Sequence, residues 1–242
     1  MKAFVKQITP PFLLELGKRL LRGSPKPVDE RLSSSDIVLT NKWFAGNKEN
    51  WEIIISDLNP TKILEIGSYE GASACFLIER LAGKSDIELH CVDTWEGGIE
   101  HQAGGEYSVN MNSVESRFKH NTGLAIQSAP HKVSLVVHKC YSDVALVKLL
   151  ADGEQGTFDF IYVDGSHQAP DVLLDAVLSF KLLRVGGVLA FDDYLWMEGL
   201  PGQCDPLRCP KPAIDAFINI NTRKLKILRA PLQQFYVVKL SD

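Results

Sequence analysis

From Pro60 onward, short apolar runs alternate with segments of helical periodicity, and this alternation limits the fold more than any other feature. The apolar runs lie at residues 62–66, 87–92, 133–137, 158–163 and 187–191. Helical patterns lie at residues 72–81, 106–126, 143–150 and 169–183, and a further one, at 47–58, precedes Pro60. Strands that alternate with helices are joined by right-handed crossovers into a parallel sheet. We therefore expect an α/β fold with a Rossmann-like, doubly wound sheet.

The last two apolar runs break this rhythm. After a helical segment at 213–219, the runs at 225–228 and 235–240 are separated by residues 229–234 alone. A linker that short cannot hold a helical crossover, so the two strands should be antiparallel neighbours. The sequence thus predicts a seven-stranded, mostly parallel sheet with one antiparallel strand near the C-terminus.

The composition limits the partners and the domain count. A length of 242 residues with 45% hydrophobic residues suits one domain with a buried core. The net charge of −4 gives no electrostatic reason to bind nucleic acid, so we expect none. No apolar run approaches the roughly 20 residues that a membrane span needs, and we expect no transmembrane segment.

The first 40 residues differ from the rest, and we expect a helical leader at 1–40 and one domain at 41–242. Residues 12–22 mix apolar and charged side chains, which favours an amphipathic helix over a signal peptide. A helix packed on its own domain, a lid, a homodimer contact and a membrane-surface anchor are the roles that stay open.

Cysteine usage indicates the compartment. The chain has five cysteines, Cys75, Cys91, Cys140, Cys204 and Cys209. An odd number without a tight framework favours a reducing environment, so we expect a cytoplasmic protein. The first three lie in apolar runs and are expected to be core thiols. Cys204 and Cys209 lack a second pair, which favours a plain loop over a metal clip.

The first strand-to-helix turn, residues 65–71, has the sequence Glu-Ile-Gly-Ser-Tyr-Glu-Gly. Ligands of open parallel sheets bind beyond the carboxyl ends of the strands, where this turn should lie. Gly67 and Gly71 form a GxxxG pattern, whereas dinucleotide folds use GxGxxG. Glu65 would repel pyrophosphate but would suit an ammonium group, as in the methionine part of S-adenosylmethionine (SAM). A generic turn with a satisfied acidic group is the alternative.

Other residues are expected to complete a nucleoside pocket. Asp93 ends the second strand, where a carboxylate can accept hydrogen bonds from both ribose hydroxyls, although NAD enzymes use the same device. Trp95 either stacks on adenine or is a half-buried loop aromatic, and residues 141–143 form the opposite rim. The expected cofactor-binding residues are Glu65, Gly67, Ser68, Tyr69, Gly71, Ser73, Asp93, Trp95, Ser142 and Asp164.

Three carboxylates should meet at one rim of this cleft. Asp164 ends the fourth strand, and Asp192 and Asp193 end the fifth. Hard oxygen ligands with room for water and substrate suit Mg²⁺, so we expect a metal site made of these three residues. Adjacent strand residues point to opposite faces, so Asp192 and Asp193 can share an ion only if the backbone turns there. Without a metal, Asp164 would contact the cofactor or the substrate directly.

A candidate general base follows the first of these carboxylates. His167 lies three residues after Asp164 on the turn to the next helix. An imidazole with an unperturbed pKa of about 6.5 can accept a proton at neutral pH, so His167 and Asp164 are the expected catalytic residues. A helix cap or a bond to a loop carbonyl is the alternative for His167.

Taken in order, these motifs resemble the class I SAM-dependent methyltransferases. The resemblance runs from residue 62 to the C-terminus and rests on the 65–71 turn, Asp93, the Val-Asp-Gly-Ser-His of 163–167, the Leu-Arg-Val-Gly-Gly of 183–187 and the final hairpin. It implies SAM as methyl donor and a small molecule as acceptor.

A narrower resemblance concerns residues 164–167 followed by Asp192 and Asp193. This pattern is similar to the metal-dependent O-methyltransferases of macrolide sugars, a group that includes cephalosporin-hydroxylase-like proteins. The resemblance implies Mg²⁺ at Asp164, Asp192 and Asp193 and a general base at His167. Asp192 departs from that group's pattern, in which the acidic pair can be Glu-Asp.

The sequence therefore predicts an enzyme that transfers a methyl group from SAM to a hydroxyl group of a small molecule, such as a sugar or a natural product, with help from a divalent metal. Two alternatives stay open. One is a SAM-binding protein without transferase activity. The other is an NAD-linked oxidoreductase, which the absent third glycine and Glu65 disfavour. The sequence does not identify the acceptor or exclude N- and C-methylation.

Overall fold

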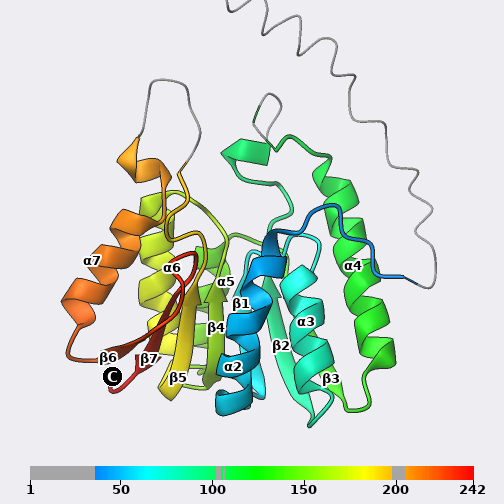
Figure 1. Cartoon of the computed structure of the whole chain (residues 1–242), viewed down its shortest axis with the longest axis horizontal. Helices are drawn as coiled ribbons and strands as arrows, with labels where there is room; N and C mark the ends of the chain where they lie inside the picture. The colour runs from blue at the N-terminus through cyan, green and yellow to red at the C-terminus, as the bar shows by residue number, and fades with distance from the viewer. Residues whose placement is uncertain (1–35, 102–104, 106, 198–204) are drawn as a thin grey trace, which may run out of the picture. The chain divides into compact units, whose positions relative to one another are not determined.

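The structure is a computed structural model that describes residues 36–101, 105, 107–197 and 205–242. In these residues seven strands form one sheet in the order β3-β2-β1-β4-β5-β7-β6 (Figure 1). The strands are β1 (Lys62–Ile66), β2 (Ile87–Val92), β3 (Val133–His138), β4 (Phe158–Val163), β5 (Leu183–Phe191), β6 (Leu225–Leu228) and β7 (Phe235–Lys239). The α helices are α2 (Lys48–Leu58), α3 (Ala72–Leu81), α4 (Met111–Ser128), α5 (Ser142–Ala151), α6 (Ala169–Leu182) and α7 (Lys211–Asn221). Short 3-10 turns are η2 (Trp43–Asn47), η3 (Ile99–His101) and η4 (Pro206–Arg208).

The strand pairing confirms the predicted sheet. β1 pairs in parallel with both β2 and β4, and β3 and β5 extend the parallel sheet on either side. β7 is antiparallel to both of its neighbours, β5 and β6. The strand order reverses between β1 and β4, so the loops that follow these two strands border a crevice.

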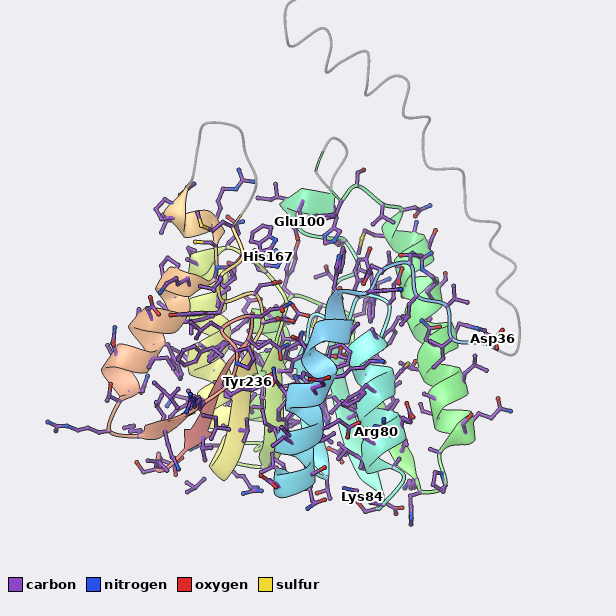
Figure 2. All side chains as sticks on the ribbon, in the orientation of Figure 1. Asp36, Arg80, Lys84, Glu100, His167 and Tyr236 are labelled. Atoms are coloured by element: carbon purple, nitrogen blue, oxygen red, sulfur yellow. The ribbon has the colours of Figure 1, made fainter. Side chains whose placement is uncertain are left out.

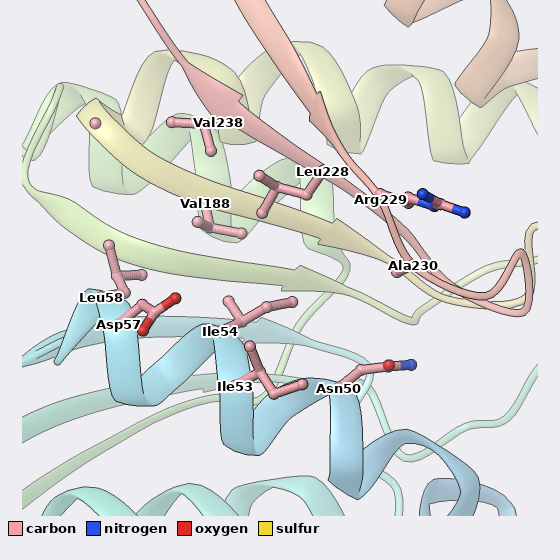
Figure 3. Close-up of a pocket in the computed structure, with 11 residues that line it drawn as sticks. Asn50, Ile53, Ile54, Asp57, Leu58, Val188, Leu228, Arg229, Ala230 and Val238 are labelled. Atoms are coloured by element: carbon pink, nitrogen blue, oxygen red, sulfur yellow. The ribbon is translucent and has the colours of Figure 1, made fainter.

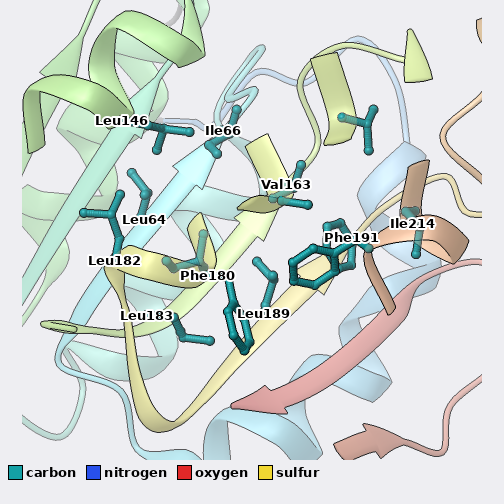
Figure 4. Close-up of a cluster of buried hydrophobic side chains, with 14 of the residues drawn as sticks. Leu64, Ile66, Leu146, Val163, Phe180, Leu182, Leu183, Leu189, Phe191 and Ile214 are labelled. Atoms are coloured by element: carbon teal, nitrogen blue, oxygen red, sulfur yellow. The ribbon is translucent and has the colours of Figure 1, made fainter. Parts of the chain in front are cut away.

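Helices cover both faces of the sheet (Figure 1). The side chains of β1 show why, because they are buried on both faces. Leu64 and Ile66 belong to a buried cluster that includes residues of α5, α6 and α7, part of which Figure 4 shows. Ile63 belongs to a second cluster, with residues of α2, α3 and α4. Successive side chains of a strand point to opposite faces, so a strand buried on both faces is apolar almost throughout.

Two element boundaries differ from the predicted ones by four residues or more. α4 begins at Met111 instead of residue 106 because the side chain of Asn110 accepts a hydrogen bond from Asn112 N at 3.0 Å and caps the helix there. β5 begins at Leu183 instead of residue 187, directly after α6, and Gly186 takes a positive φ of 81° within it. Glycine adopts this left-handed backbone without a steric cost, so the strand continues through it.

The leader predicted at 1–40 lies outside the described residues except for its last part. Val38 N donates to Asn121 Oδ1 at 2.8 Å, and Thr40 binds Glu70 through both its amide and its hydroxyl, at 2.7 Å and 2.6 Å. The end of the predicted leader thus contacts the domain, and the boundary at residue 40 stays a prediction. None of the helices in the described part of the chain is long and apolar enough to cross a membrane.

The described cysteines carry free thiols. Cys75 and Cys91 are buried, as predicted, and burial raises the pKa of both thiols. Cys140 is only partly buried and lines the cavity described below. Cys209 is buried and donates to the carbonyl of Pro206 at 3.1 Å, whereas Cys204 lies outside the described residues, so the choice between a loop pair and a metal clip stays open.

Candidate functional site

A cavity of about 850 Å³ opens at the carboxyl ends of β1, β2, β4 and β5. The position is the one expected for an open sheet whose strand order reverses between β1 and β4. The predicted site residues among its lining are Gly67, Ser68, Tyr69, Ser73, Asp93, Ser142, Asp164, His167, Asp192 and Asp193. The remaining three, Glu65, Gly71 and Trp95, lie behind this lining.

A second cavity, of about 360 Å³, lies between α2 and strands β5, β7 and β6 (Figure 3). Its lining is largely aliphatic, with Ile54, Val188 and Leu228 among its members, and its charged residues are Asp57 and Arg229. This lining contains neither an imidazole nor a group of carboxylates. The chemistry of the described residues therefore centres on the larger cavity.

The glycine turn after β1 lies against the segment that follows β4. Gly67 has a φ of 86°, and a β-carbon there would lie 1.9 Å from the carbonyl oxygen of Asp164. Only glycine permits both this backbone conformation and this approach. Gly71, with a φ of 81°, forms the N-cap of α3. The two predicted glycines thus shape the turn, and Gly67 places it next to the carboxylate rim.

Asp93 fixes the same turn from the end of β2. Its Oδ2 accepts hydrogen bonds from the amides of Ser68 at 3.0 Å and Tyr69 at 2.9 Å, and its Oδ1 accepts from Trp95 N at 2.7 Å. A carboxylate oxygen has two lone pairs, so Oδ1, which accepts one hydrogen bond, can accept a further one from the cavity side. Contact with a ribose stays a prediction that this position permits.

Glu65 does not reach the cavity. It is fully buried and accepts hydrogen bonds from Ser68 Oγ at 2.6 Å, from Ser73 Oγ and from Cys91 Sγ at 3.4 Å. Burial raises the pKa of this carboxyl group. The alternative of a satisfied acidic group describes Glu65 here, because Ser68 and Ser73 stand between its oxygens and the cavity that they line.

Trp95 is part of the core. Its side chain is 4% exposed, its indole N–H donates to the carbonyl of Tyr69 at 2.9 Å, and its ring packs against Phe118 with centroids 4.8 Å apart. A ring held on its edge and its face by the protein offers no free surface to adenine. The position favours the structural alternative for Trp95.

Tyr162 joins two of the predicted carboxylates. Its buried hydroxyl contacts Asp164 Oδ2 at 2.9 Å and also Asp192 Oδ2. A phenol has one proton to donate, so the two carboxylates compete for it. Burial, followed by repulsion between the carboxylates, raises the pKa of both Asp164 and Asp192. This site therefore concentrates negative charge where little water can compensate it.

The backbone does turn after β5, as a shared rim requires. β5 ends at Phe191, Asp193 has a φ of 54°, and both Asp192 and Asp193 line the cavity. The carboxylate of Asp193 nevertheless faces His167 Nε2 at 2.9 Å. In the described ranges no group of three or more His, Cys, Asp or Glu side chains is arranged to hold a metal ion. The metal site at the three carboxylates therefore stays a prediction, and in this structure Asp193 pairs with His167.

His167 lies among acidic groups beyond the carboxyl ends of the strands. Its Nε2 faces Asp193, its Nδ1 lies 3.4 Å from Glu100 Oε1, and its ring stacks on Trp196 with centroids 4.1 Å apart. Figure 2 shows Glu100 and His167 near each other above the strands. Burial alone would lower the pKa of His167, but the bonds to Asp193 and Glu100 outweigh it and raise the pKa to about 9. In this arrangement His167 is a cation at neutral pH.

Aromatic side chains line the outer part of the cavity. The ring of Trp43, 49% exposed, lies 5.1 Å from that of Tyr69 and 5.5 Å from that of Tyr107, measured between centroids. His101 lies 5.4 Å from Tyr69. We call Trp43, Tyr69, His101 and Tyr107 the aromatic wall. Such faces stack on planar or cationic groups.

Several of these residues were not predicted from the sequence. The sequence could have indicated Tyr162, because it is the one polar side chain near the end of an otherwise apolar run and precedes Asp164 by two residues. Nothing in the sequence pointed to Glu100 or Trp43, because both come from segments without helical or strand periodicity. Glu70 was passed over within the turn, and it pairs with buried Arg117 at 2.6 Å.

Comparison with known proteins agrees with the fold. A family described as a methyltransferase domain matches residues 64–194, more than half of the chain. A probable caffeoyl-CoA O-methyltransferase 3 of Dictyostelium discoideum is 42% identical over 153 residues, covering 62% of this chain and 51% of that protein. A flavonoid 3',5'-methyltransferase of Vitis vinifera is 30% identical over 145 residues, covering 60% and 52%. The chain spans about half the length of these curated relatives.

Solved structures share the fold at low sequence identity. An O-methyltransferase from Bacillus cereus in complex with SAH, the demethylated form of SAM, has a TM-score of 0.55 at 16% identity and covers 98% of this chain and 96% of its own. The O-methyltransferase TomG from Streptomyces achromogenes, in complex with SAM, has a TM-score of 0.54 at 17% identity, with coverages of 85% and 83%. The family match and the sheet order together show that the chain belongs to the class I SAM-dependent methyltransferases.

Proposed function

We propose that this chain transfers the methyl group of SAM to a hydroxyl group of a small molecule. One observation carries the proposal: the glycine turn and the carboxylate rim line the same cavity and touch each other at Gly67 and Asp164. A donor on the turn and an acceptor on the rim would therefore meet inside one enclosed space. The descriptions of the relatives as O-methyltransferases support oxygen as the accepting atom.

The donor side uses the turn and its neighbours. Ser68 and Ser73 line the cavity in front of Glu65 and are placed to bind the polar end of methionine. In this proposal Asp93 binds the ribose and Ser142 the base, the roles predicted from the sequence. Positioning of this kind accounts for much of the rate of methyl transfer, because SAM already carries a good leaving group.

The acceptor side must align an oxygen and remove its proton. The hydroxyl oxygen attacks the methyl carbon, the carbon–sulfur bond breaks, its electron pair goes to sulfur, and SAH leaves. The proton goes to a carboxylate of the rim, with Asp164 the first candidate. His167 serves as the base only after Asp193 releases it, since its pKa of about 9 favours the cation. Until then it can stabilise negative charge that develops on the oxygen.

The aromatic wall favours a flat acceptor. A hydroxylated aromatic ring would stack on Trp43 or Tyr69 and point its hydroxyl inward. The descriptions of two relatives name caffeoyl-CoA and a flavonoid, and both of these compounds contain hydroxylated aromatic rings. A sugar, which the narrower sequence resemblance suggests, is the second acceptor class to test.

A divalent metal fits this site in part. Asp164 and Asp192 provide hard oxygens, and both contact the hydroxyl of Tyr162, so their mutual repulsion is what a cation would relieve. Asp193 binds His167 through its Oδ2, so its other oxygen is the one that could join them. When bound, Mg²⁺ would hold and polarise the acceptor oxygen. Metal dependence therefore belongs to the proposal and rests on Asp164 and Asp192.

Two experiments test the proposal. Titration calorimetry with SAM and with NADH separates it from an NAD-linked oxidoreductase, and binding of NADH without SAM would overturn it. Methyl transfer from labelled SAM to a catechol and to a free sugar separates it from a SAM-binding protein without activity. The same assay after full chelation with EDTA tests the metal, and undiminished transfer would remove Mg²⁺ from the proposal. A cytoplasmic location and a homodimer stay predictions from the sequence.

A further inference from the structure

The cavity has an apolar part next to α5 and α6. These two helices follow β3 and β4 in the chain and pack on each other. The apolar residues of its lining there are Val92, Cys140, Val144 and Leu174. The polar residues that these two helices contribute to the lining are Ser142 and Asp143 at the start of α5 and Asp171 and Asp175 in α6. Of these three carboxylates Asp143 and Asp171 are exposed, whereas Asp175 is buried.

Asp175 is buried without a full set of partners. Its side chain is 1% exposed, and its Oδ1 has no hydrogen-bond partner among the described residues. Ser142 contacts the carboxylate, and a β-carbon at Gly165 would lie 3.9 Å from its Oδ2. Buried polar atoms in native proteins are almost always hydrogen-bonded, so the unsatisfied oxygen indicates a donor that the protein itself does not provide. Burial, the largest effect, raises the pKa of Asp175 to about 7.

The donor can be identified from the geometry of the cofactor. The glycine turn and Asp93 lie on the β1 and β2 side of the cavity, and they would take the methionine and the ribose. The base of the nucleoside then extends toward Ser142 and Gly165, into the apolar part. The edge of adenine that arrives there carries a 6-amino group, which donates, and N1, which accepts. A carboxyl group is complementary to this edge, since its oxygen accepts from the amine and its proton, when present, goes to N1.

We propose that Asp175 accepts a hydrogen bond from the 6-amino group of the SAM adenine and thereby makes the site selective for adenine. This inference rests on the proposed function, because it requires that SAM binds in the cavity. It assigns to α6 a role that the glycine turn cannot have, since the turn contacts the methionine end.

A structural role is the competing explanation. Asp175 could hold the first turn of α5 in place through Ser142 without touching a ligand. The two explanations differ in one respect: a structural role affects every ligand of the pocket equally, whereas a bond to the amine affects only ligands that carry it.

The test compares SAH with 6-deamino-SAH, which lacks the amine, by titration calorimetry on the full chain. The proposal predicts that the wild type binds SAH about tenfold more tightly, the gain expected of one hydrogen bond. Asp175→Leu keeps the approximate shape without an acceptor, and it should weaken SAH about tenfold while leaving 6-deamino-SAH unchanged. Asp175→Asn keeps an oxygen acceptor and should keep the preference.

Asp171→Asn is the matched control. Asp171 lies one turn earlier in α6 and also lines the cavity, but it already accepts a hydrogen bond from Ser166 Oγ at 2.7 Å. Its substitution should leave the ratio of the two affinities unchanged.

Three outcomes would overturn the inference. The wild type could bind the two ligands equally, Asp175→Leu could weaken both by the same factor, or Asp171→Asn could abolish the preference as well. If Asp175→Leu does not fold, as circular dichroism would show, Asp175→Ala provides the same comparison. Failure of the wild type to bind SAH at all would remove the proposed function together with this inference, and is thus distinct from binding without a preference.

Discussion

Gly67 lies so close to Asp164 that a β-carbon on the glycine would stand 1.9 Å from the carbonyl oxygen of the aspartate. The turn assigned to the methyl donor and the loop assigned to the acceptor are thus in direct backbone contact. The contact is reinforced by the amide of Asp164, which donates to the carbonyl of Ile66 at 2.8 Å.

Gly67→Ala should destabilise the protein strongly. The alanine would meet the Asp164 carbonyl and would also have to adopt a φ of 86°. Steric conflict and backbone strain together predict a loss of about 3 kcal/mol or more in the free energy of unfolding, measured in urea. The matched control is Gly123→Ala in α4, where nothing lies within 4 Å of the added carbon and a gain of up to about 1 kcal/mol is expected. Equal effects at the two glycines would contradict the close approach.

Asp164→Asn should strongly reduce turnover while SAH still binds. The substitution removes a carboxylate of the rim but keeps its shape and its contact with Tyr162. Loss of a group that takes or stabilises the proton lowers the rate by about 100-fold or more. Initial rates with labelled SAM and calorimetry with SAH measure the two effects. Asp152→Asn, at an exposed pair with Lys148, is the control and should change neither. Unchanged turnover in Asp164→Asn would exclude the carboxylate from the reaction.

Asp175 should make the stability of the unliganded protein fall with rising pH. Its pKa is about 7 in the folded protein against an ordinary value of 3.8, so the folded state alone resists ionisation. Below about pH 4 the group is protonated in both states and imposes no cost; the cost grows from there and is complete above pH 7.

The matching measurement compares Asp175→Asn with the wild type. Between pH 4 and pH 8, the free energy of unfolding of the variant should rise by about 1–3 kcal/mol relative to that of the wild type. Urea denaturation at pH 4, 5.5 and 8 gives this difference directly. A difference that does not depend on pH would show that Asp175 ionises normally.

Arg117→Met should cost far more stability than Lys119→Met. Arg117 is buried against Glu70, which is itself buried in the glycine turn, at 2.6 Å. Removing it leaves an uncompensated buried carboxylate, at a cost of about 3–5 kcal/mol. Lys119 makes an exposed ion pair with Glu115 on the same helix, where about 0.5 kcal/mol is expected. SAH affinity should fall with Arg117→Met alone, because Glu70 belongs to the turn; similar losses for both variants would contradict this.

The sequence by itself determined the sheet and the positions of the loops that matter. Apolar runs of the right length, joined by helical segments, leave little choice of topology, and the short linker at 229–234 imposes the antiparallel β7. Residues at strand ends, such as Asp93 and Asp164, were located because parallel strands place their carboxyl ends at one edge.

Only the tertiary structure decided where the side chains point and which of them pair. Glu65 and Trp95 were expected in the pocket, yet both are buried behind it, since Ser68, Ser73, Tyr69 and Phe118 satisfy them. His167 pairs with Asp193, a contact that the sequence did not predict. Such choices depend on charge and burial contributed by segments distant in the chain, and local periodicity carries no information about them.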